Sequence, residues 1–338
     1  MRAAIFNPYL DTLGGGERYT LSFAHVLAES EFSTDLEWKE PEIKKILEER
    51  FGMDLSKINV IPDVKRGDGY DICFWVSDGS IPLLRARKNF LHFQVPFHGV
   101  NGRTLLNKMK LFRINKIVCN SRFTKGFIDK EYGVDSVVIY PPVATDKIRP
   151  MRKENIILFV GRFSRLKQSK GQDVLINAFK KLYDEGTKDW KLVLAGGMEI
   201  GVGDYLGKLK SDARGYPIEF IESPDFKTLK NLYGKAKIFW SASGFGEDEA
   251  KNPEKVEHFG ISVVEAMAGG AVPIVYNAGG HKEIVQDGKN GFLWDTVEEL
   301  LEKTRLLVND NRGLSKNAVQ ASKSFSYENF SSEVKKIL

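Results

Sequence analysis

The sequence predicts an α/β protein built from two successive doubly wound parallel sheets. Short apolar segments alternate with amphipathic ones along the chain, which is typical of β-α units on a parallel sheet. With 338 residues, 42% of them apolar, the chain favours two domains over one. A proline pair, Pro141 and Pro142, followed by a charged segment, interrupts the alternation.

The first half is predicted to hold strands and helices in alternating groups. Apolar segments predict strands at 3–6, 59–61, 71–76, 89–93, 116–120 and 136–140. Helical spacing of apolar residues predicts helices at 17–29, 40–51, 103–112 and 121–132.

The alternation resumes after the proline pair. Strands are expected at 155–161, 191–196, 218–221, 237–241, 272–276 and 291–294. Helices are expected at 172–183, 225–233, 260–268, 281–285 and 297–308. The expected domains are therefore 1–148 and 149–321, and an amphipathic helix at 322–338 either caps the second domain or lies apart from it. Ligands of doubly wound sheets bind beyond the carboxyl ends of the strands, so a cleft between the two halves is the expected site.

Composition excludes several classes of protein. No apolar segment approaches the roughly 18–20 residues that span a bilayer, and the apolar stretch at the N-terminus is too short for a secretory signal. Cys73 and Cys119 lie in apolar strand segments, which favours buried thiols in a reducing cytosol over a disulfide. Five scattered histidines offer no zinc-ligand cluster. We expect a cytoplasmic protein with no metal site.

Positive charge is concentrated in one segment. Between Arg85 and Lys130, eleven Lys and Arg residues accompany one acid, Asp129, so this segment carries +10 (11 − 1) in a chain of net charge +5. Such a basic surface indicates an anionic partner: a phosphate-bearing substrate, an acidic lipid or a nucleic acid. A solvated surface of a lysine-rich protein is the alternative.

A carboxylate, a glycine and a helix start follow one another at 257–265. Glu257 precedes Gly260, which allows close approach of a backbone, and Glu265 lies in the helix that follows, where it can accept bonds from sugar hydroxyls. Unpaired amides at a helix start bind anions. Here they would belong to Phe259, Gly260, Ile261 and Ser262. Two glutamates at this spacing also fit a solvated helix face, so both interpretations stay open.

Two cations follow the first strand of the second half. Arg162 comes directly after Gly161 at the end of that strand, and Lys170 precedes the next helix. A bidentate guanidinium and an ammonium suit a diphosphate. An ordinary surface role is the alternative for both, and Arg165 and Lys167 crowd the same loop.

Two candidates lie in the first half. Gly14, Gly15 and Gly16 follow the first strand and suit either a phosphate loop or a simple turn. His92 lies on an apolar strand, where a core histidine is the alternative to a functional one.

Together these motifs resemble glycosyltransferase family 4. The segment EHFGISVVE at 257–265 matches the family pattern E-x-F-G-x-x-x-x-E in full. Gly161-Arg162 and Lys170-Gly171 resemble the cation pair that the family places on the diphosphate. Their spacing is three residues longer than the commonest form, so Lys167 is an alternative to Lys170.

Further likenesses extend over nearly the whole chain. They are the glycine loop with Glu17 and Arg18, His92 in LHFQVP, NSRFT at 120–124, YPPV at 140–143, NAGGHKEIV at 277–285 and DGKNGFLW at 287–294.

The resemblance implies a GT-B fold, two Rossmann-like domains facing across a cleft. Residues 1–148 would bind the acceptor, 149–321 the nucleotide sugar, and the helix 322–338 would cross back to the first domain. The implied chemistry is glycosyl transfer with retention of configuration, through an oxocarbenium-like transition state. No cofactor or metal is implied, because Arg and Lys act on the diphosphate.

The resemblance also implies a role for each candidate residue. Arg162 and Lys170 would stabilise the leaving diphosphate, with amides near Gly260 assisting. Glu257 would hold hydroxyls of the donor sugar, and Glu265 the ribose. The others are His92, which would contact the sugar or phosphate, and Gly14–Gly16, whose backbone would approach the diphosphate.

Within the family, the segment 244–260 looks most like mannosyltransferases that extend lipid-linked oligosaccharides. We therefore expect a hexose donor such as GDP-mannose or UDP-glucose. We interpret the acidic cluster Glu247–Glu249 as a solvated loop rather than a metal site.

The basic segment contains a short amphipathic helix near 103–113, whose cations are Arg103, Lys108, Lys110 and Arg113. Such helices lie in membrane interfaces and favour anionic head groups. We expect a protein peripheral on the cytoplasmic face of the membrane with a lipid-phosphate-linked acceptor; a soluble glycan acceptor is the alternative.

Two other functions remain open. A sugar-nucleotide epimerase and a non-catalytic nucleotide-sugar-binding protein share this fold. Nucleic acid is not expected, because no aromatic-interleaved RNA motif accompanies the basic segment.

Overall fold

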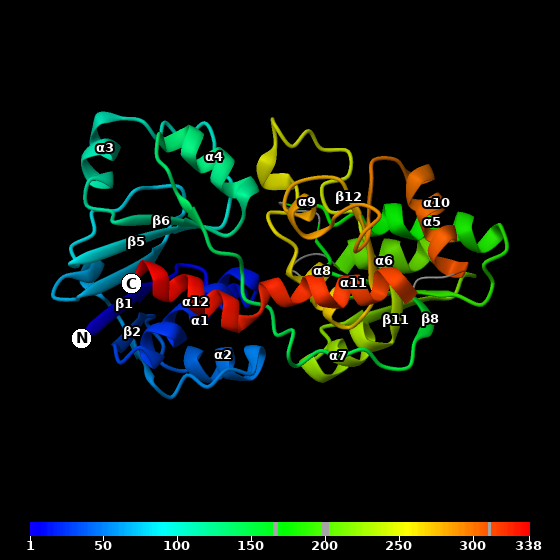
Figure 1. The fold of residues 1–338 in the computed structure, drawn as a ribbon, viewed down its shortest axis with the longest axis horizontal. Helices are drawn as coiled ribbons and strands as arrows, with labels where there is room; N and C mark the ends of the chain where they lie inside the picture. The colour runs from blue at the N-terminus through cyan, green and yellow to red at the C-terminus, as the bar shows by residue number, and fades with distance from the viewer. Residues whose placement is uncertain (165–167, 198–202, 310–311) are drawn as a thin grey trace. The chain divides into compact units, whose positions relative to one another are not determined.

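The structure, a computed structural model, describes residues 1–164, 168–197, 203–309 and 312–338. The chain forms two compact units (Figure 1). Unit 1 contains Met1–Pro142 and Tyr327–Leu338, and unit 2 contains Val143–Ser326. These divisions lie six and five residues from the expected boundaries at 148 and 321.

Unit 1 is built on a seven-stranded, wholly parallel sheet in the order β3-β2-β1-β4-β5-β6-β7. Its strands are β1 (Arg2–Phe6), β2 (Ser33–Glu37), β3 (Ile58–Ile61), β4 (Ile72–Val76), β5 (Lys88–Phe93), β6 (Lys116–Cys119) and β7 (Val137–Val138). Its helices are α1 (Gly15–Glu29), α2 (Ile43–Phe51), α3 (Leu105–Leu111), α4 (Arg122–Tyr132) and α12 (Tyr327–Ile337), with short 3-10 helices at Leu10–Thr12 and Lys65–Gly67.

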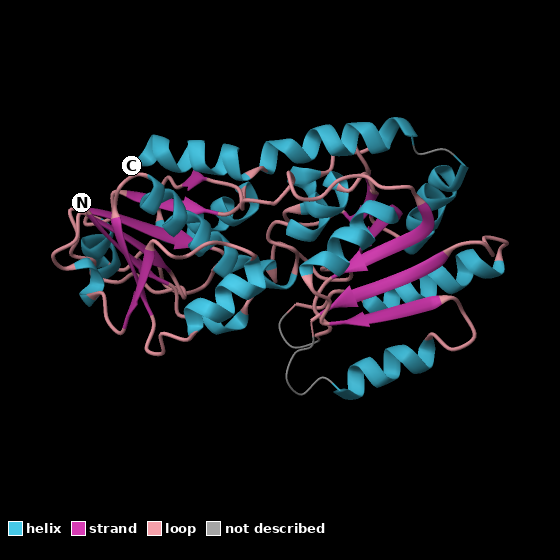
Figure 2. Cartoon of the chain, turned by 90° about the horizontal axis from the view of Figure 1, so that it is seen from below, coloured by secondary structure: helices cyan, strands magenta, loops and turns pink. Residues whose placement is uncertain are grey.

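Unit 2 holds a six-stranded parallel sheet in the order β10-β9-β8-β11-β12-β13. Figure 2 shows helices above and below its strands. The strands are β8 (Glu154–Val160), β9 (Lys191–Gly196), β10 (Ile218–Glu222), β11 (Ala236–Ser241), β12 (Val272–Tyr276) and β13 (Phe292–Trp294). The helices are α5 (Gln172–Asp184), α6 (Gly203–Asp212), α7 (Phe226–Lys235), α8 (Ile261–Ala268), α9 (His281–Ile284), α10 (Val297–Asn309) and α11 (Arg312–Ser322), with 3-10 helices at Pro253–Lys255 and Lys323–Phe325.

The predicted fold class, two doubly wound Rossmann-like sheets, is confirmed. Strand β2, however, was not predicted, and neither were α6 and α11. The sequence of β2, STDLE, has one aliphatic residue, yet Asp35 is buried. Its carboxylate accepts hydrogen bonds from the side chains of Arg2, Asn59 and Tyr70. A satisfied polar interior of this kind has no apolar signature in the sequence.

The end of the chain is divided between the two units. The expected continuous helix at 322–338 is interrupted at Ser326, whose backbone is extended. In unit 2, Val143 N donates to Phe325 O at 2.8 Å. Beyond Ser326, α12 lies beside α1 (Figure 1), and its Phe330 and Val334 are buried in the core of unit 1.

Candidate active site

In the sheet of unit 2 the strand order reverses at β8: the chain first adds strands on one side of β8 and then on the other. Strands β9 and β10 lie on one side of β8, whereas β11, β12 and β13 lie on the other. In doubly wound sheets the crevice beyond the carboxyl ends of the two central strands binds ligands. The predicted residues Gly161, Arg162 and Lys170 follow β8, so the sequence places them at this point.

Glycines let the chain turn tightly at the end of β8. A Cβ atom on Gly196 would lie 1.9 Å from Gly161 O, so no side chain fits there. Gly161 N donates to Ala195 O at 3.0 Å. The main-chain oxygen of Arg162 accepts from Gln172 Nε2 at 2.9 Å, which fixes the backbone from which the exposed Arg162 side chain extends.

Lys170 and Glu257 form an ion pair at the centre of the site. Lys170 Nζ lies 2.8 Å from Glu257 Oε2 and 2.6 Å from Gln168 Oε1. The side chains of Lys170 and Glu257 are 17% and 20% exposed. Gln168, which the sequence analysis did not select, also donates from Nε2 to Val256 O and so joins the loop after β8 to the segment that carries Glu257.

The ion pair keeps Glu257 charged. Burial is the largest single influence and would raise the pKa of the Glu257 carboxyl, but the Lys170 ammonium and the neighbouring His281 and His258 together outweigh it and lower this pKa to about 2. A carboxylate at neutral pH accepts hydrogen bonds only, so it suits the hydroxyl groups of a sugar. The Lys170 ammonium has three N–H donors, and among the described residues Glu257 and Gln168 take two of them, so one remains for a phosphate oxygen.

A glycine pair supports the Glu257 segment from behind. Gly280 N donates to Glu257 O at 2.7 Å. A Cβ on Gly279 would lie 2.1 Å from the same oxygen, and one on Gly280 would lie 2.4 Å from Phe259 Cα. This close packing explains why the segment 277–285 carries two adjacent glycines.

His281 belongs to the same support, although the sequence analysis gave it no role. The ring is fully buried, and burial lowers its pKa. Its Nδ1 donates to Tyr276 O at 2.9 Å, so Nε2 accepts from the Ser241 hydroxyl at 3.3 Å. His281 thus joins the ends of β11 and β12 to the loop that holds Glu257.

The predicted helix start begins one residue later than expected. Gly260 has φ +116°, and Val263 N and Val264 N make the first helical bonds of α8 to Gly260 O. The amides of Ile261 and Ser262 precede those bonds. Glu265 is 8% exposed and accepts a hydrogen bond from Tyr233 at 2.8 Å. Its role toward a ribose stays a prediction.

The alternative diphosphate lysine, Lys167, lies outside the described residues, as does Arg165. Lys170 is therefore the lysine of this loop whose surroundings the structure defines.

The acidic residues Glu247, Asp248 and Glu249 each pair with a lysine: Lys255 at 3.4 Å, Lys251 at 3.2 Å and Lys282 at 2.5 Å. Across the described part of the chain, no group of three or more His, Cys, Asp or Glu residues is arranged to hold a metal ion.

In unit 1 the glycine loop starts α1. Gly14 N donates to Glu17 Oε2 at 2.6 Å, and α1 begins at Gly15. Gly16 lies against Gln94, because a Cβ there would be 1.8 Å from Gln94 Oε1. Close packing within unit 1 thus requires Gly16; a contact of this loop with diphosphate stays a prediction.

His92 is a core residue of unit 1 in this structure. It is fully buried, and its ring stacks on Tyr19 with centroids 4.0 Å apart. Burial lowers its pKa to about 3, so the ring is neutral and Nδ1 donates to Val118 O. Nε2 has no hydrogen-bond partner among the residues described. No part of the ring is open to a ligand here, so a sugar contact would require it to become accessible.

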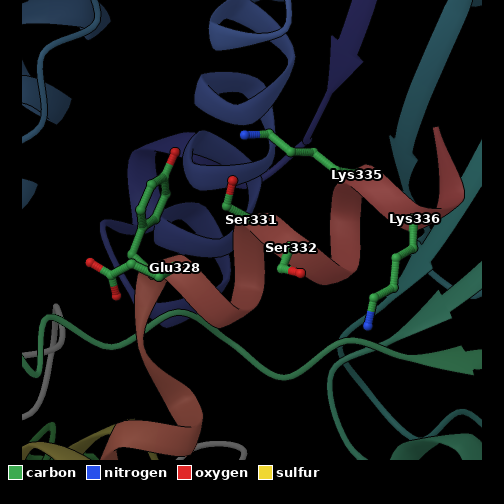
Figure 3. A pocket seen from close by; sticks show the side chains of 6 residues that line it. Glu328, Ser331, Ser332, Lys335 and Lys336 are labelled. Carbon is green, nitrogen blue, oxygen red and sulfur yellow. The ribbon is translucent and has the colours of Figure 1, made fainter.

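An open hollow lies along α12 (Figure 3). Lys335 and Lys336 at its rim extend in different directions, so they do not converge on one anion. No predicted site residue lines it, and we assign it no function.

Comparison with known proteins decides the family. A sequence model of the glycosyl transferases group 1 matches residues 144–325, which is more than half of the chain. The chain belongs to this family. The matched segment covers β8 to α11 and contains the Lys170–Glu257 pair.

Relatives extend the comparison to the first unit of this group 1 glycosyl transferase. It is 25% identical to the uncharacterized glycosyltransferase MJ1178 of Methanocaldococcus jannaschii over 325 residues, covering 91% of this chain and 86% of that protein. It is 28% identical over 228 residues to the GDP-Man:Man(3)GlcNAc(2)-PP-Dol alpha-1,2-mannosyltransferase of Dictyostelium discoideum. That match covers 62% of this chain and 43% of the relative, so the chain spans less than half of that mannosyltransferase.

Solved structures confirm the GT-B fold of this glycosyl transferase. HepE of Anabaena, determined in complex with UDP, aligns with a TM-score of 0.77 at 17% identity and covers 99% of both chains. A glycosyltransferase of Rickettsia africae aligns with a TM-score of 0.75 at 20% identity, over 99% of this chain and 98% of that one.

Proposed function

We propose that this enzyme is a retaining glycosyltransferase of family 4 that transfers a hexose, mannose or glucose, from a nucleoside diphosphate sugar to a glycan or lipid-linked acceptor. The observation that carries the proposal is the largely buried Lys170–Glu257 pair beside the start of α8, at the reversal point of the donor-domain sheet. The pair places a carboxylate, which accepts hydrogen bonds from sugar hydroxyls, next to an ammonium, which donates hydrogen bonds to a phosphate.

The transfer breaks the bond between the anomeric carbon and the diphosphate, and negative charge grows on the leaving oxygen. Cations and amides that are already in place stabilise this charge more in the transition state than in the ground state. Arg162, Lys170 and the amides of Ile261 and Ser262 supply them. Glu257 orients the sugar through its hydroxyls, so the anomeric carbon is presented to the acceptor.

The identity of the donor rests on two different likenesses. The Dictyostelium relative is named as a GDP-mannose enzyme, and a HepE structure was determined with UDP-glucose. We propose that the donor is one of these two nucleotide sugars. Because cations of the chain neutralise the diphosphate, donor binding needs no metal and is unaffected by EDTA.

The proposal is tested first by donor binding. Thermal unfolding is followed with GDP-mannose, UDP-glucose, UDP-N-acetylglucosamine and their free diphosphates. A ligand at a hundred times its Kd adds about 2.7 kcal/mol, which raises the Tm of a unit of this size by roughly 5–10 °C. We expect Arg162→Met and Lys170→Met to abolish the shift, whereas Lys227→Met, an exposed lysine of the same unit, retains it.

Catalysis is tested by hydrolysis of the bound donor, with water as the acceptor. We expect the sugar first released to keep the donor's anomeric configuration, as seen by proton NMR before mutarotation. Loss of one diphosphate contact lowers the rate by about a hundredfold or more. Inversion would refute the retaining assignment. Formation of an epimerised nucleotide sugar would refute glycosyl transfer and support the epimerase alternative.

A further inference from the structure

We propose that α3 docks unit 1 onto an anionic lipid bilayer, lying in the plane of the membrane with one apolar face inserted. The proposal concerns a surface of unit 1 and does not depend on the donor site of unit 2.

The outward side of α3 is apolar and exposed. Leu105 is 76% exposed, Leu106 60%, Met109 65% and Phe112, at the helix end, 93%. No residue of α3 is buried. Four large apolar side chains on a single short helix form a patch that a soluble surface rarely carries without a partner.

These side chains share one face of the helix. At about 100° per residue, Leu105, Met109 and Phe112 point within about 60° of one another, and Leu106 widens the face by about 60°. Leu111 points to the opposite side, where it is half-buried and packs on the core cluster that contains Phe93 and Tyr132. The exposed apolar face therefore turns away from unit 1.

Lysines border this face on both sides. Lys108 and Lys110 each lie about 100° from its centre, in opposite directions. This is the arrangement of a helix in a membrane interface, with apolar side chains among the acyl chains and ammonium groups at the level of the phosphates. The surrounding basic segment has one acid, Asp129, and that residue pairs with Lys125 at 2.6 Å. The charge favours anionic lipid.

Polar contacts fix the start of α3. The Glu131 carboxylate accepts hydrogen bonds from the amides of Gly99, Val100 and Gly102 at 2.9–3.1 Å. Thr104 caps the helix by accepting from Asn107 N. The helix is thus held at its base while its outer face stays uncovered, so its exposure does not come from fraying.

Arg103, one of the predicted cations, lies just before the start of α3. The Arg103 guanidinium donates to Lys130 O at 2.7 and 3.1 Å. Arg103 therefore also anchors the segment before α3, and it stays one of the predicted cations of this surface with Lys108, Lys110 and Arg113. None of the helices in the described part of the chain is both long and apolar enough to cross a bilayer.

The test is sedimentation of the whole protein with sucrose-loaded vesicles of pure phosphatidylcholine and of phosphatidylcholine with 30% phosphatidylglycerol. We expect binding to the anionic vesicles that weakens in 0.5 M NaCl. Each surface cation contributes about fivefold, so Lys108→Gln/Lys110→Gln should bind about thirtyfold more weakly. Leu105→Ser/Phe112→Ser should lose on the order of a hundredfold.

Matched controls use exposed residues elsewhere. Lys39→Gln/Lys57→Gln removes the same charge from unit 1, and Ile46→Ser/Leu306→Ser removes two exposed apolar side chains. Both should bind as the parent does. Parent-like binding by the two α3 variants would overturn the proposal. So would a folded parent that ignores both vesicles; if light scattering then showed a dimer that Leu105→Ser/Phe112→Ser dissociates, the face would be an interface between copies.

Discussion

The Lys170–Glu257 ion pair should contribute far more to stability than an exposed pair of the same chemistry. The perturbation is a double-mutant cycle of Lys170→Met, Glu257→Gln and the double variant. Moving the pKa of Glu257 from its ordinary 4.5 to about 2 corresponds to roughly 3 kcal/mol at 1.36 kcal/mol per pKa unit, and Lys170 is the largest of the groups that lower this pKa against the opposing effect of burial. We therefore expect a coupling free energy of about 2–3 kcal/mol, with each single variant leaving a poorly solvated charge behind.

The assay is hydrogen exchange at the amides of β8 and β11, which reports the free energy of opening of unit 2 alone. Lys210 and Glu222 provide the control: they pair at 2.5 Å in the same unit, but their side chains are 48% and 44% exposed. Their coupling should stay below about 1 kcal/mol. Equal coupling for the two pairs would refute the argument that burial strengthens the Lys170–Glu257 interaction.

The same prediction has a pH dependence. Because the pKa of Glu257 is lower in the folded than in the unfolded protein, its stabilisation is complete above about pH 4.5. It is lost as the pH falls from there toward about 2. The stability difference between the parent and Glu257→Gln should therefore be constant from pH 8 to 5 and shrink below pH 4.5. A difference that grows on acidification would contradict the assigned direction.

Two further predictions concern the support of this pair. Gly279→Ala places a methyl group 2.1 Å from a main-chain oxygen, whereas Gly288→Ala meets nothing within 4 Å at a similar positive φ. The first should therefore cost more stability by at least about 1–3 kcal/mol and weaken donor binding in the thermal-shift assay; equal losses would sink the packing argument. His281→Phe replaces the imidazole with a phenyl ring that can make neither bond, although Tyr276 O and Ser241 Oγ keep their bonds to Ala278 N and Ser243 N. It should therefore destabilise unit 2 by roughly 1–3 kcal/mol, and a variant as stable as the parent by hydrogen exchange would show that these bonds contribute little.

Local patterns predicted the elements that carry the site. Apolar segments identified β8 and β11, and the glycine before Ile261 indicated the start of α8 to within one residue. Local patterns succeed here because a buried parallel strand and a helix start each leave a signature within a few residues.

The contacts that hold the site together were not predictable in this way. Gln168 and Val256 are 88 residues apart, and Ser241 and His281 are 40 apart. No spacing rule connects such partners, because the fold alone brings them together. Strand β2 was not predicted for a related reason. Its buried Asp35 is hydrogen-bonded by partners from other parts of the chain, so the strand lacks the apolar pattern that would identify it.

The division of the C-terminal residues has a consequence for biosynthesis. Unit 2 is in effect a 184-residue insertion within unit 1, and its two ends meet where Val143 N bonds Phe325 O. At roughly 5–20 residues per second, the ribosome makes α12 about 10–40 s after Pro142. Until then the core of unit 1 lacks Phe330 and Val334. The unit translated first is therefore completed last, whereas unit 2 has all of its sequence, with adjoining ends, before synthesis is finished.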